Sequence, residues 1–213
     1  MASTTLPLSI VFISVVVCVS AHPLIPHNIS LRSTLTAASQ NFKWVSLSGE
    51  FAFGFHSVAP PLYSVGVWFE NISDFTFAWT AKTDDEELRV EKGSTLHLSA
   101  AGLQVFDSQR RLKWVAGPAE NENESISAAA MLNNGNFVLL NRSAAPIWQS
   151  FDEPTDTLLP GQTLRFNHTM FCKASDTNSS SGRFGLTVKD GIDLVIYLVE
   201  RLADKGAYWG ASD

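Results

Sequence analysis

The sequence predicts an all-β fold assembled from repeated hairpin units. Three stretches share one plan, in which two short alternating strands flank a turn that carries Gly, and a Trp follows the second strand. They read HLSAAGLQVFD followed by Trp114, AAMLNNGNFVLLN followed by Trp148, and FGLTVKDGIDLVIY followed by Trp209. Units this small cannot fold alone, so they must bury their aromatic faces in one shared core. A binding scaffold built from β repeats is therefore the leading interpretation.

A looser version of the same unit lies upstream, in SGEFAFGF, YSVGVWFE and FTFAWTAK. Alternation of apolar with small or polar residues is the period of a half-buried strand. In each segment one set of residues is expected to share a face. These sets are Phe51, Phe53 and Phe55; Tyr63, Val65, Val67 and Phe69; and Phe75 and Phe77, joined by Trp79. Residues 22–45 are polar with scattered apolar positions.

The expected turns follow from short motifs. Asn134-Gly135 and Asp190-Gly191 predict two-residue hairpins, because both central positions of such turns need φ > 0. Ala101-Gly102 is a weaker version of the same signal. The acidic run at residues 84–87 predicts a solvated loop, since no spacing typical of Ca²⁺ ligands follows it. The run of Ser and Gly at residues 179–182 predicts a flexible joint.

The N-terminus predicts export. Residues 9–19 are apolar but shorter than the about 20 residues that span a bilayer, and Ser20 and Ala21 supply small residues for cleavage. One departure from a secretory signal is that no Lys or Arg precedes Arg32, and a membrane anchor is the alternative. We expect a signal peptide at 1–21, a first domain at 22–160, a linker at 161–181 and an incomplete second copy at 182–213. No later segment is expected to cross a membrane, so the mature chain is expected to be secreted.

Sequons support an extracellular location. Glycosylation is expected at the Asn-X-Ser/Thr triplets that begin at Asn28, Asn71, Asn123, Asn141, Asn167 and Asn178. Cys18 leaves with the signal, so Cys172 is alone in the mature chain. It is either a partly buried thiol in a loop or a residue whose partner lies in sequence outside these residues.

Composition excludes several classes of function. The net charge of −6 without a basic cluster argues against nucleic acid or an anionic membrane as partner. The five histidines lack metal-ligand spacing, and no metal or cofactor is expected. Asp152, Glu153 and Asp156 suggest a glycosidase, but neighbouring prolines indicate a structured turn instead. No phosphate loop or kinase motif is present, so we expect no catalytic residue and no enzyme activity.

Five segments carry a resemblance to a known family. SGEFAFGF, YSVGVWF, FAWTAK, MLNNGNFVLL and above all IWQSFDEPTDTLLPGQTL resemble the bulb-type (monocot mannose-binding) lectin domain. Of the members of this family, the extracellular part of plant G-type lectin S-receptor-like serine/threonine kinases and S-locus glycoproteins bears a closer likeness than the bulb lectins do. The resemblance runs from about residue 30 to the C-terminus. It implies a β-prism, which is three four-stranded antiparallel sheets about a pseudo-threefold axis with the tryptophans in the middle.

The resemblance also implies where sugar binds. The family carries the row Gln-X-Asp-X-Asn-X-Val-X-Tyr once per sheet. Alternate residues of a strand project to one face, so the polar trio of the row can bond adjacent sugar hydroxyls while Val supports the ring.

This chain departs from that row in every copy. The three rows are Leu98, Ala100, Gly102, Gln104 and Phe106; Leu132, Asn134, Asn136, Val138 and Leu140; and Lys189, Gly191, Asp193, Val195 and Tyr197. The second row keeps Asn136 and Val138, and the third keeps Val195 and Tyr197. Candidate sugar contacts are therefore the second row and, from the third, Lys189, Asp193, Val195 and Tyr197. The alternative for Asn134 and Asn136 is a role in hairpin geometry.

The sequence thus favours a secreted, glycosylated carbohydrate-binding module with weakened or altered sugar specificity. The resemblance implies mannose-containing glycans as ligands, an apoplastic or cell-surface location, and a homodimer or a receptor as partner. Two alternatives stay open. One is a protein-recognition module that acts as a soluble decoy. The other is the N-terminal fragment of a full lectin receptor-like kinase.

Overall fold

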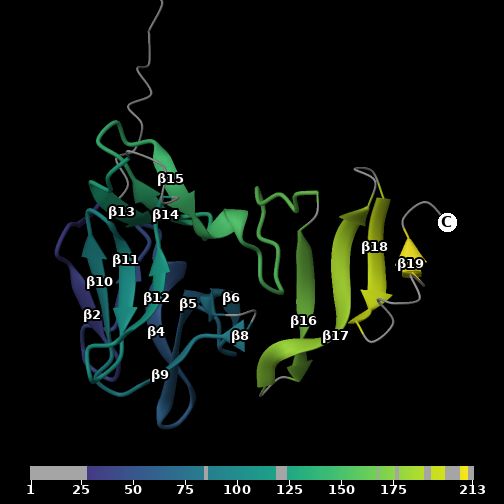
Figure 1. Ribbon diagram of the computed structural model, residues 1–213, viewed down its shortest axis with the longest axis horizontal. Coiled ribbons are helices and arrows are strands. Elements are labelled where there is room, and N and C mark those ends of the chain that lie inside the picture. Colours follow the sequence, from purple (N-terminus) through teal and green to yellow (C-terminus); the bar gives the residue numbers. More distant parts are fainter. Residues whose placement is uncertain are drawn as a thin grey trace, which may run out of the picture.

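The computed structural model describes residues 28–83, 86–118, 124–166, 168–175, 178–189, 193–199 and 207–210 (Figure 1). Strands make up nearly all the regular structure in these ranges, and a three-residue 3-10 turn lies at Ser150–Asp152. Every strand pairing is antiparallel. The predicted all-β class is therefore confirmed.

Three sheets form the first part of the chain. Sheet A has the order β1 (Ile29–Ser30), β13 (Ala128–Met131), β14 (Phe137–Leu140) and β15 (Pro146–Gln149). Sheet B has the order β12 (Leu112–Ala116), β11 (Gly102–Phe106), β10 (Thr95–Ser99) and β2 (Thr34–Thr36). Sheet C has the order β3 (Lys43–Val45), β4 (Phe51–Ala59), β5 (Leu62–Phe69) and β6 (Phe77–Thr80), and β9 (Arg89–Glu91) also pairs with β5.

Sheet C has five strands where four were expected. β6 pairs with Gly66–Trp68 and β9 pairs with Leu62–Ser64, so the two short strands share one edge of the long strand β5. A two-stranded ribbon of β7 (Lys82–Thr83) and β8 (Glu86–Glu87) lies between them in sequence, so Glu86 and Glu87 are not part of the predicted loop. Asp84 and Asp85 lie outside the described residues.

A fourth sheet, sheet D, stands beside the three-sheet body (Figure 1). Its order is β16 (Thr169–Ser175), β17 (Asn178–Lys189), β18 (Asp193–Leu198) and β19 (Ala207–Gly210). Residues 169–175 and 178–181, which the sequence assigned to a linker, therefore lie in strands. Ser179–Gly182 continue β17 rather than forming a joint, because their backbone pairs with β16.

The predicted repeat appears in the register of all four sheets. In each sheet a Trp of the last strand lies opposite an aliphatic residue of the preceding strand, and the register shifts at the next residue. The pairs are Val67–Trp79, Val105–Trp114, Leu139–Trp148 and Ile196–Trp209. A β-bulge at the same point in every unit shows that the units share one backbone plan.

Tryptophans from three sheets meet in the middle of the body. The ring centroids of Trp79 and Trp114 are 6.2 Å apart, those of Trp79 and Trp148 5.9 Å, and those of Trp114 and Trp148 6.3 Å. Glu153 bonds two of these rings, since its carbonyl oxygen accepts from Trp79 Nε1 at 2.8 Å and its Oε1 accepts from Trp148 Nε1 at 3.2 Å. The central tryptophans implied by the resemblance are confirmed.

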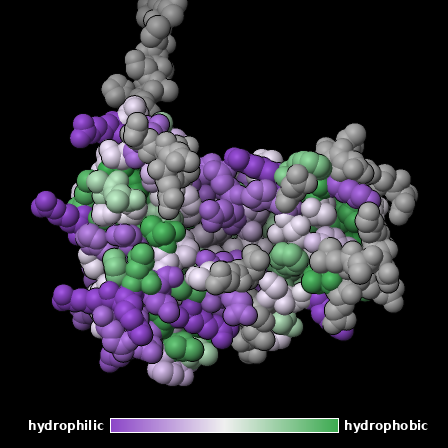
Figure 2. Space-filling view, viewed as in Figure 1, coloured by the Kyte–Doolittle hydropathy of each residue, from purple (hydrophilic) through white to green (hydrophobic). Residues whose placement is uncertain are grey.

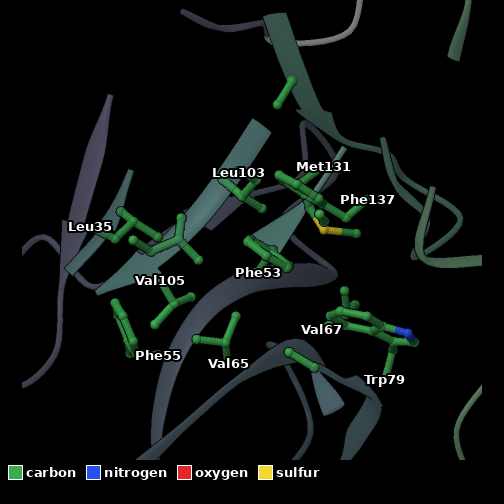
Figure 3. Close-up of a cluster of buried hydrophobic side chains, with 14 of the residues drawn as sticks. Leu35, Phe53, Phe55, Val65, Val67, Trp79, Leu103, Val105, Met131 and Phe137 are labelled. Atoms are coloured by element: carbon green, nitrogen blue, oxygen red, sulfur yellow. The ribbon is translucent and has the colours of Figure 1, made fainter. Parts of the chain in front are cut away.

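The core lies around Phe53 of sheet C. Its ring stacks on Phe137 of sheet A with centroids 3.7 Å apart, and Leu103 of sheet B is fully buried in the same cluster. Figure 3 shows these three side chains converging from their separate sheets. Each sheet therefore buries its inner face against the other two, as expected for units that cannot fold alone.

Two predictions about sheet C are wrong. β4 is buried on both faces at Phe51–Phe55 rather than half-buried, because Trp68 and Phe77 cover its outer face at Ala52. Phe77 and Trp79 do not share a face, because the bulge at Ala78 in β6 turns Phe77 outward and Trp79 into the core. Phe75 precedes β6 and is exposed.

The N-terminal segment joins two sheets. β1 pairs with β13 in sheet A and β2 pairs with β10 in sheet B, with a turn at Arg32 (φ 70°) between them. These strands have two and three residues, so they are too short to show the alternation of apolar and polar residues by which a strand is predicted from sequence.

Candidate functional site

The second predicted row lies on the outer face of sheet A. Leu132 N donates to Asn136 O at 2.9 Å across a three-residue turn, and Ala130 pairs with Val138. Because the turn has an odd number of residues, the residues that lie opposite each other are both even-numbered or both odd-numbered. The even-numbered positions of the two strands therefore share one face, and the row aligns as expected at Leu132, Asn136, Val138 and Leu140. The predicted two-residue hairpin at Asn134-Gly135 is wrong, since only Gly135 has positive φ (88°) and the turn has three residues.

The polar groups of this row are bonded within the fold. Asn136 is 5% exposed; its Nδ2 donates to Gln149 Oε1 at 2.8 Å, and its Oδ1 accepts from Ser150 Oγ and Phe151 N, both at 3.2 Å. Asn134 Oδ1 accepts from Asn136 N at 3.1 Å, which is a turn contact. Val138 and Leu140 pack in a small apolar cluster with Leu132.

The last row lies on sheet D. Lys189 is exposed and pairs in register with Asp193, while Val195 is 9% exposed. Tyr197 OH donates to Thr169 Oγ1 at 3.4 Å, so its hydroxyl is directed across its own sheet. Gly191, the Asp190-Gly191 turn and the side chain of Asp193 lie outside the described residues.

The first row is divided between two faces of sheet B. The turn there has two residues, Ala100 and Ala101, between the paired Ser99 and Gly102, so the turn expected at Ala101-Gly102 is one residue off. With an even number of turn residues, even-numbered positions of β10 lie opposite odd-numbered positions of β11. Leu98 is therefore fully buried on the inner face, while Gln104 and Phe106 lie on the outer face.

Sheet B has an open outer face that sequence reasoning missed. Thr34, His97, Gln104 and Val115 lie side by side across its four strands. Within the described ranges, the side chains of His97 and Gln104 have no hydrogen-bond partner. Val115 is 53% exposed. The alternation of TLHLS could have shown that His97 faces outward, but the strand β2 beside it could not be read from sequence.

The carboxylates of the WQSFDEPTDT segment have structural partners. Asp152 bonds Arg165 at 2.5 Å, Asp156 bonds Lys173 at 3.0 Å, and Glu153 bonds the tryptophans described above. A glycosidase needs two carboxyl groups that are free to act as acid and base. These three carboxylates do not form such a pair.

The structure describes three of the six predicted glycosylation sites with their side chains, and it describes the cysteine Cys172. Asn28 and Asn71 are exposed, and Asn141 is half-buried, where its Oδ1 accepts from Ser143 N and Ala145 N at 3.0 Å. Asn123, Asn167, the side chain of Asn178 and the predicted signal peptide lie outside the described residues. Cys172 is a free, exposed thiol in β16, not a partly buried one in a loop.

Two further features are absent from the described residues. These ranges contain no group of three or more His, Cys, Asp or Glu side chains that could hold a metal ion. Nor do they contain a helix with the length and hydropathy needed to span a bilayer.

Comparison with known proteins gives the family. Residues 76–181 match the family model for D-mannose binding lectin. The chain contains a bulb-type lectin domain. Its three-sheet body with a central cluster of tryptophans is the β-prism of that family, and the resemblance inferred from the sequence is confirmed.

The curated relatives of this lectin domain are receptor-like kinases. The chain is 39% identical over 180 residues to LECRK2 of Oryza sativa subsp. indica, a G-type lectin S-receptor-like serine/threonine-protein kinase, with 81% of this chain and 22% of the relative covered. Identity is 31% over 180 residues to RLK1 of Arabidopsis thaliana, with 80% and 21% covered. The chain therefore spans less than a quarter of either relative, and the alignments do not extend over their full length.

Among solved structures, the chain is similar to the Japanese Marasmius oreades lectin. The TM-score is 0.37 at 13% sequence identity, and the alignment covers 58% of this chain and 88% of that chain.

Proposed function

We propose that this chain is an exported carbohydrate-binding module of the lectin-receptor type whose sugar rows have diverged. The observation that carries the proposal is the open row of Thr34, His97 and Gln104 on sheet B, whose His and Gln side chains have no partner in the described part of the chain. The family match supports a glycan as ligand, with mannose as the first sugar to test.

The row offers what a sugar edge requires. An amide supplies both donor and acceptor, and a neutral imidazole supplies one of each, so Gln104 and His97 can bond neighbouring hydroxyls. Val115 beside Gln104 and Phe106 on the same face supply apolar contact for the ring. On sheet A the equivalent polar groups already bond each other, so sugar binding there is expected to be weak.

The location and modification of the module belong to the same proposal. We infer an extracellular domain with glycans at the exposed Asn28 and Asn71. The relatives' names describe receptor-like kinases, and in such a receptor this domain would recognise the ligand. A gel band that does not shift after glycosidase treatment of the exported protein would contradict the glycosylation.

The experiment is a glycan array followed by calorimetric titration with mannotriose. Replacement of Gln104 by Ala is expected to weaken binding by about threefold to tenfold, the effect of one lost hydrogen bond. Gln109→Ala is the matched control, because Gln109 is exposed in the loop after β11 and away from the row. Equal affinity of the parent and Gln104→Ala would exclude this row as the binding face.

Protein recognition is a second candidate. Leu112 and Val115 of β12 are 52% and 53% exposed, and an apolar pair on an open sheet suits a protein partner. On the face in view in Figure 2, however, hydrophobic residues form small separate patches among hydrophilic ones. A silent glycan array combined with a receptor that co-purifies with the chain would favour this candidate.

A further inference from the structure

The outer face of sheet C carries a cluster of aromatic rings. Trp68 and Phe77 lie opposite each other on β5 and β6, are 3% and 5% exposed, and meet edge to face with centroids 6.2 Å apart. His56 of β4 lies on the same face, with its ring centroid 5.7 Å from that of Trp68. These three rings come from three neighbouring strands.

A glycine makes room for the cluster. A Cβ on Gly66 would lie 2.7 Å from two ring carbons of Phe77 and 2.3 Å from Trp79 O. Real Cβ atoms essentially never approach other atoms so closely, so any larger residue would displace the ring. The Phe77 ring can therefore lie directly against the backbone of β5, where it is fixed by packing.

Phe75 forms the exposed layer of this cluster. Its ring stacks on His56 with centroids 3.4 Å apart and an interplanar angle of 12°, and it meets Phe77 edge-on at 4.8 Å. Phe75 is nevertheless 42% exposed. One face of the ring is held by His56, so the exposed part is a rigid aromatic surface directed at solvent, which loses little entropy when a ligand binds.

A charged pair borders the aromatic surface. Glu70 Oε2 accepts from Trp68 Nε1 at 2.9 Å, and Lys43 Nζ donates to Glu70 Oε1. The Lys43 and Glu70 side chains are 29% and 23% exposed. The pair has no net charge but keeps exposed acceptor and donor groups, so it favours a neutral ligand with hydroxyl groups over an ionic one.

We propose that Phe75, supported by His56, is a stacking platform for a neutral sugar ring of a glycan, with Glu70 and Lys43 bonding its hydroxyls. A pyranose has a face of C–H groups and an edge of hydroxyls. The negative face of an aromatic ring attracts polarised C–H groups, and their burial adds a hydrophobic contribution. The proposal rests on the proposed carbohydrate-binding function but places a second contact on sheet C, separate from the row on sheet B.

The test compares variants of the full chain in calorimetric titrations with methyl α-mannoside and mannotriose. Phe75→Ala is expected to weaken binding by about threefold to tenfold, the contribution of one aromatic contact. Phe75→Tyr keeps the ring and is expected to retain the affinity. Ile72→Ala is the matched control, because Ile72 lies in the same loop, is 47% exposed and has no ring.

Each outcome decides the matter. Loss in Phe75→Ala, with Phe75→Tyr and Ile72→Ala like the parent, supports the platform. Unchanged binding in Phe75→Ala overturns the platform and leaves carbohydrate binding standing. Equal weakening by Phe75→Ala and Ile72→Ala overturns it in favour of a general apolar contact. A parent that binds no glycan overturns both the platform and the proposed function. Circular dichroism of each variant confirms that the fold is intact.

Discussion

Asn136 bonds three neighbours, Gln149, Ser150 and Phe151, through both ends of its amide. From sequence, the same residue matches a polar position of the family's sugar row. The partners are 13 to 15 residues away along the chain, and only the pairing of β14 with β15 brings them close. Residue type and spacing therefore place Asn136 in the row but could not show that its hydrogen bonds are already made.

Replacement of Asn136 by Ala is expected to destabilise the fold by about 1–3 kcal/mol, because Ser150 Oγ and Phe151 N lose a buried acceptor. Urea unfolding followed by tryptophan fluorescence measures the change. Asn134→Asp is the control, since it keeps the turn acceptor and is expected to be nearly neutral. A variant as stable as the parent would mean that Asn136 is free for ligand.

His56 gives stability a defined pH dependence. Burial lowers the pKa of His56 from its ordinary value of 6.5, against the opposing effects of a hydrogen bond to Ser57 and of Glu70, with Lys43 adding to the decrease. Below pH 6.5 the unfolded chain binds a proton that the folded chain resists. The stability that neutral His56 contributes to the fold is therefore fully present above pH 6.5, and it is lost as the pH falls toward the pKa of His56 in the folded state.

Unfolding free energies between pH 8 and pH 5 measure this effect. The parent is expected to lose stability in that interval, and His56→Phe, which keeps a ring against Phe75, is expected to lose less. The same slope in both proteins would show that another group is responsible.

At the scale of elements, the loops that precede the last strands of sheets B and A share one hydrogen-bond pattern. Asp107 accepts from Gln109 N and Arg111 N, and Asn141 accepts from Ser143 N and Ala145 N in the same pattern. The bond from the Arg111 backbone is the main reason why the pKa of Asp107 is lowered. Each turn precedes its unit's Trp by seven residues, a spacing that could have been read from sequence.

The hairpin of sheet A depends on Gly135 for two reasons. Its φ is +88°, and a Cβ there would lie 2.4 Å from Leu159 Cδ1 and 2.9 Å from the Phe51 ring. Gly93 has a similar φ of +84° but open space around it. Gly93→Ala is expected to cost about 1–2 kcal/mol from the backbone alone, and Gly135→Ala about 1–3 kcal/mol more from crowding.

Thermal unfolding of the two glycine variants separates the two causes. Gly135→Ala should melt several degrees below Gly93→Ala. Equal melting temperatures would mean that the core around Leu159 adapts without cost.

Sequence reasoning recovered the elements with strong alternation and failed where pairing decides the outcome. The strands of Phe51–Phe55, Tyr63–Phe69 and the repeated hairpins were predicted because alternation is a local signal. The short strands β1 and β2 were not, because pairing with distant strands defines them. Whether a row stays on one face depends on the number of residues in its turn. The two-residue turn of sheet B divides the Leu98 row between two faces, and the three-residue turn of sheet A keeps the Leu132 row on one face. The Gly signals in the sequence did not give these turn lengths.

At the scale of the whole molecule, sheet D differs from the other three. Val67, Val105 and Leu139, which face the tryptophans in sheets C, B and A, are 0% exposed. The equivalent Ile196 of sheet D is only half-buried. Sheet D is thus less covered at Ile196 than the other sheets are at their equivalent positions, and we propose that it associates with a second copy or a receptor.

Removal of residues 169–213 is expected to leave the three-sheet body folded and more monomeric, because the main core cluster lies between Ile29 and Leu159. Size-exclusion chromatography with light scattering, together with circular dichroism, measures both properties. A shortened chain that aggregates more than the parent would show that sheet D protects the body instead.

The measurement that tests the account most directly is a two-dimensional amide NMR titration of the full chain with mannotriose. The account predicts shift changes at His97 and Gln104 on sheet B and around Phe75 on sheet C. It predicts little change at Asn134 and Asn136, whose polar groups are already bonded. Changes centred on the Asn134–Asn136 hairpin, with sheets B and C silent, would contradict it.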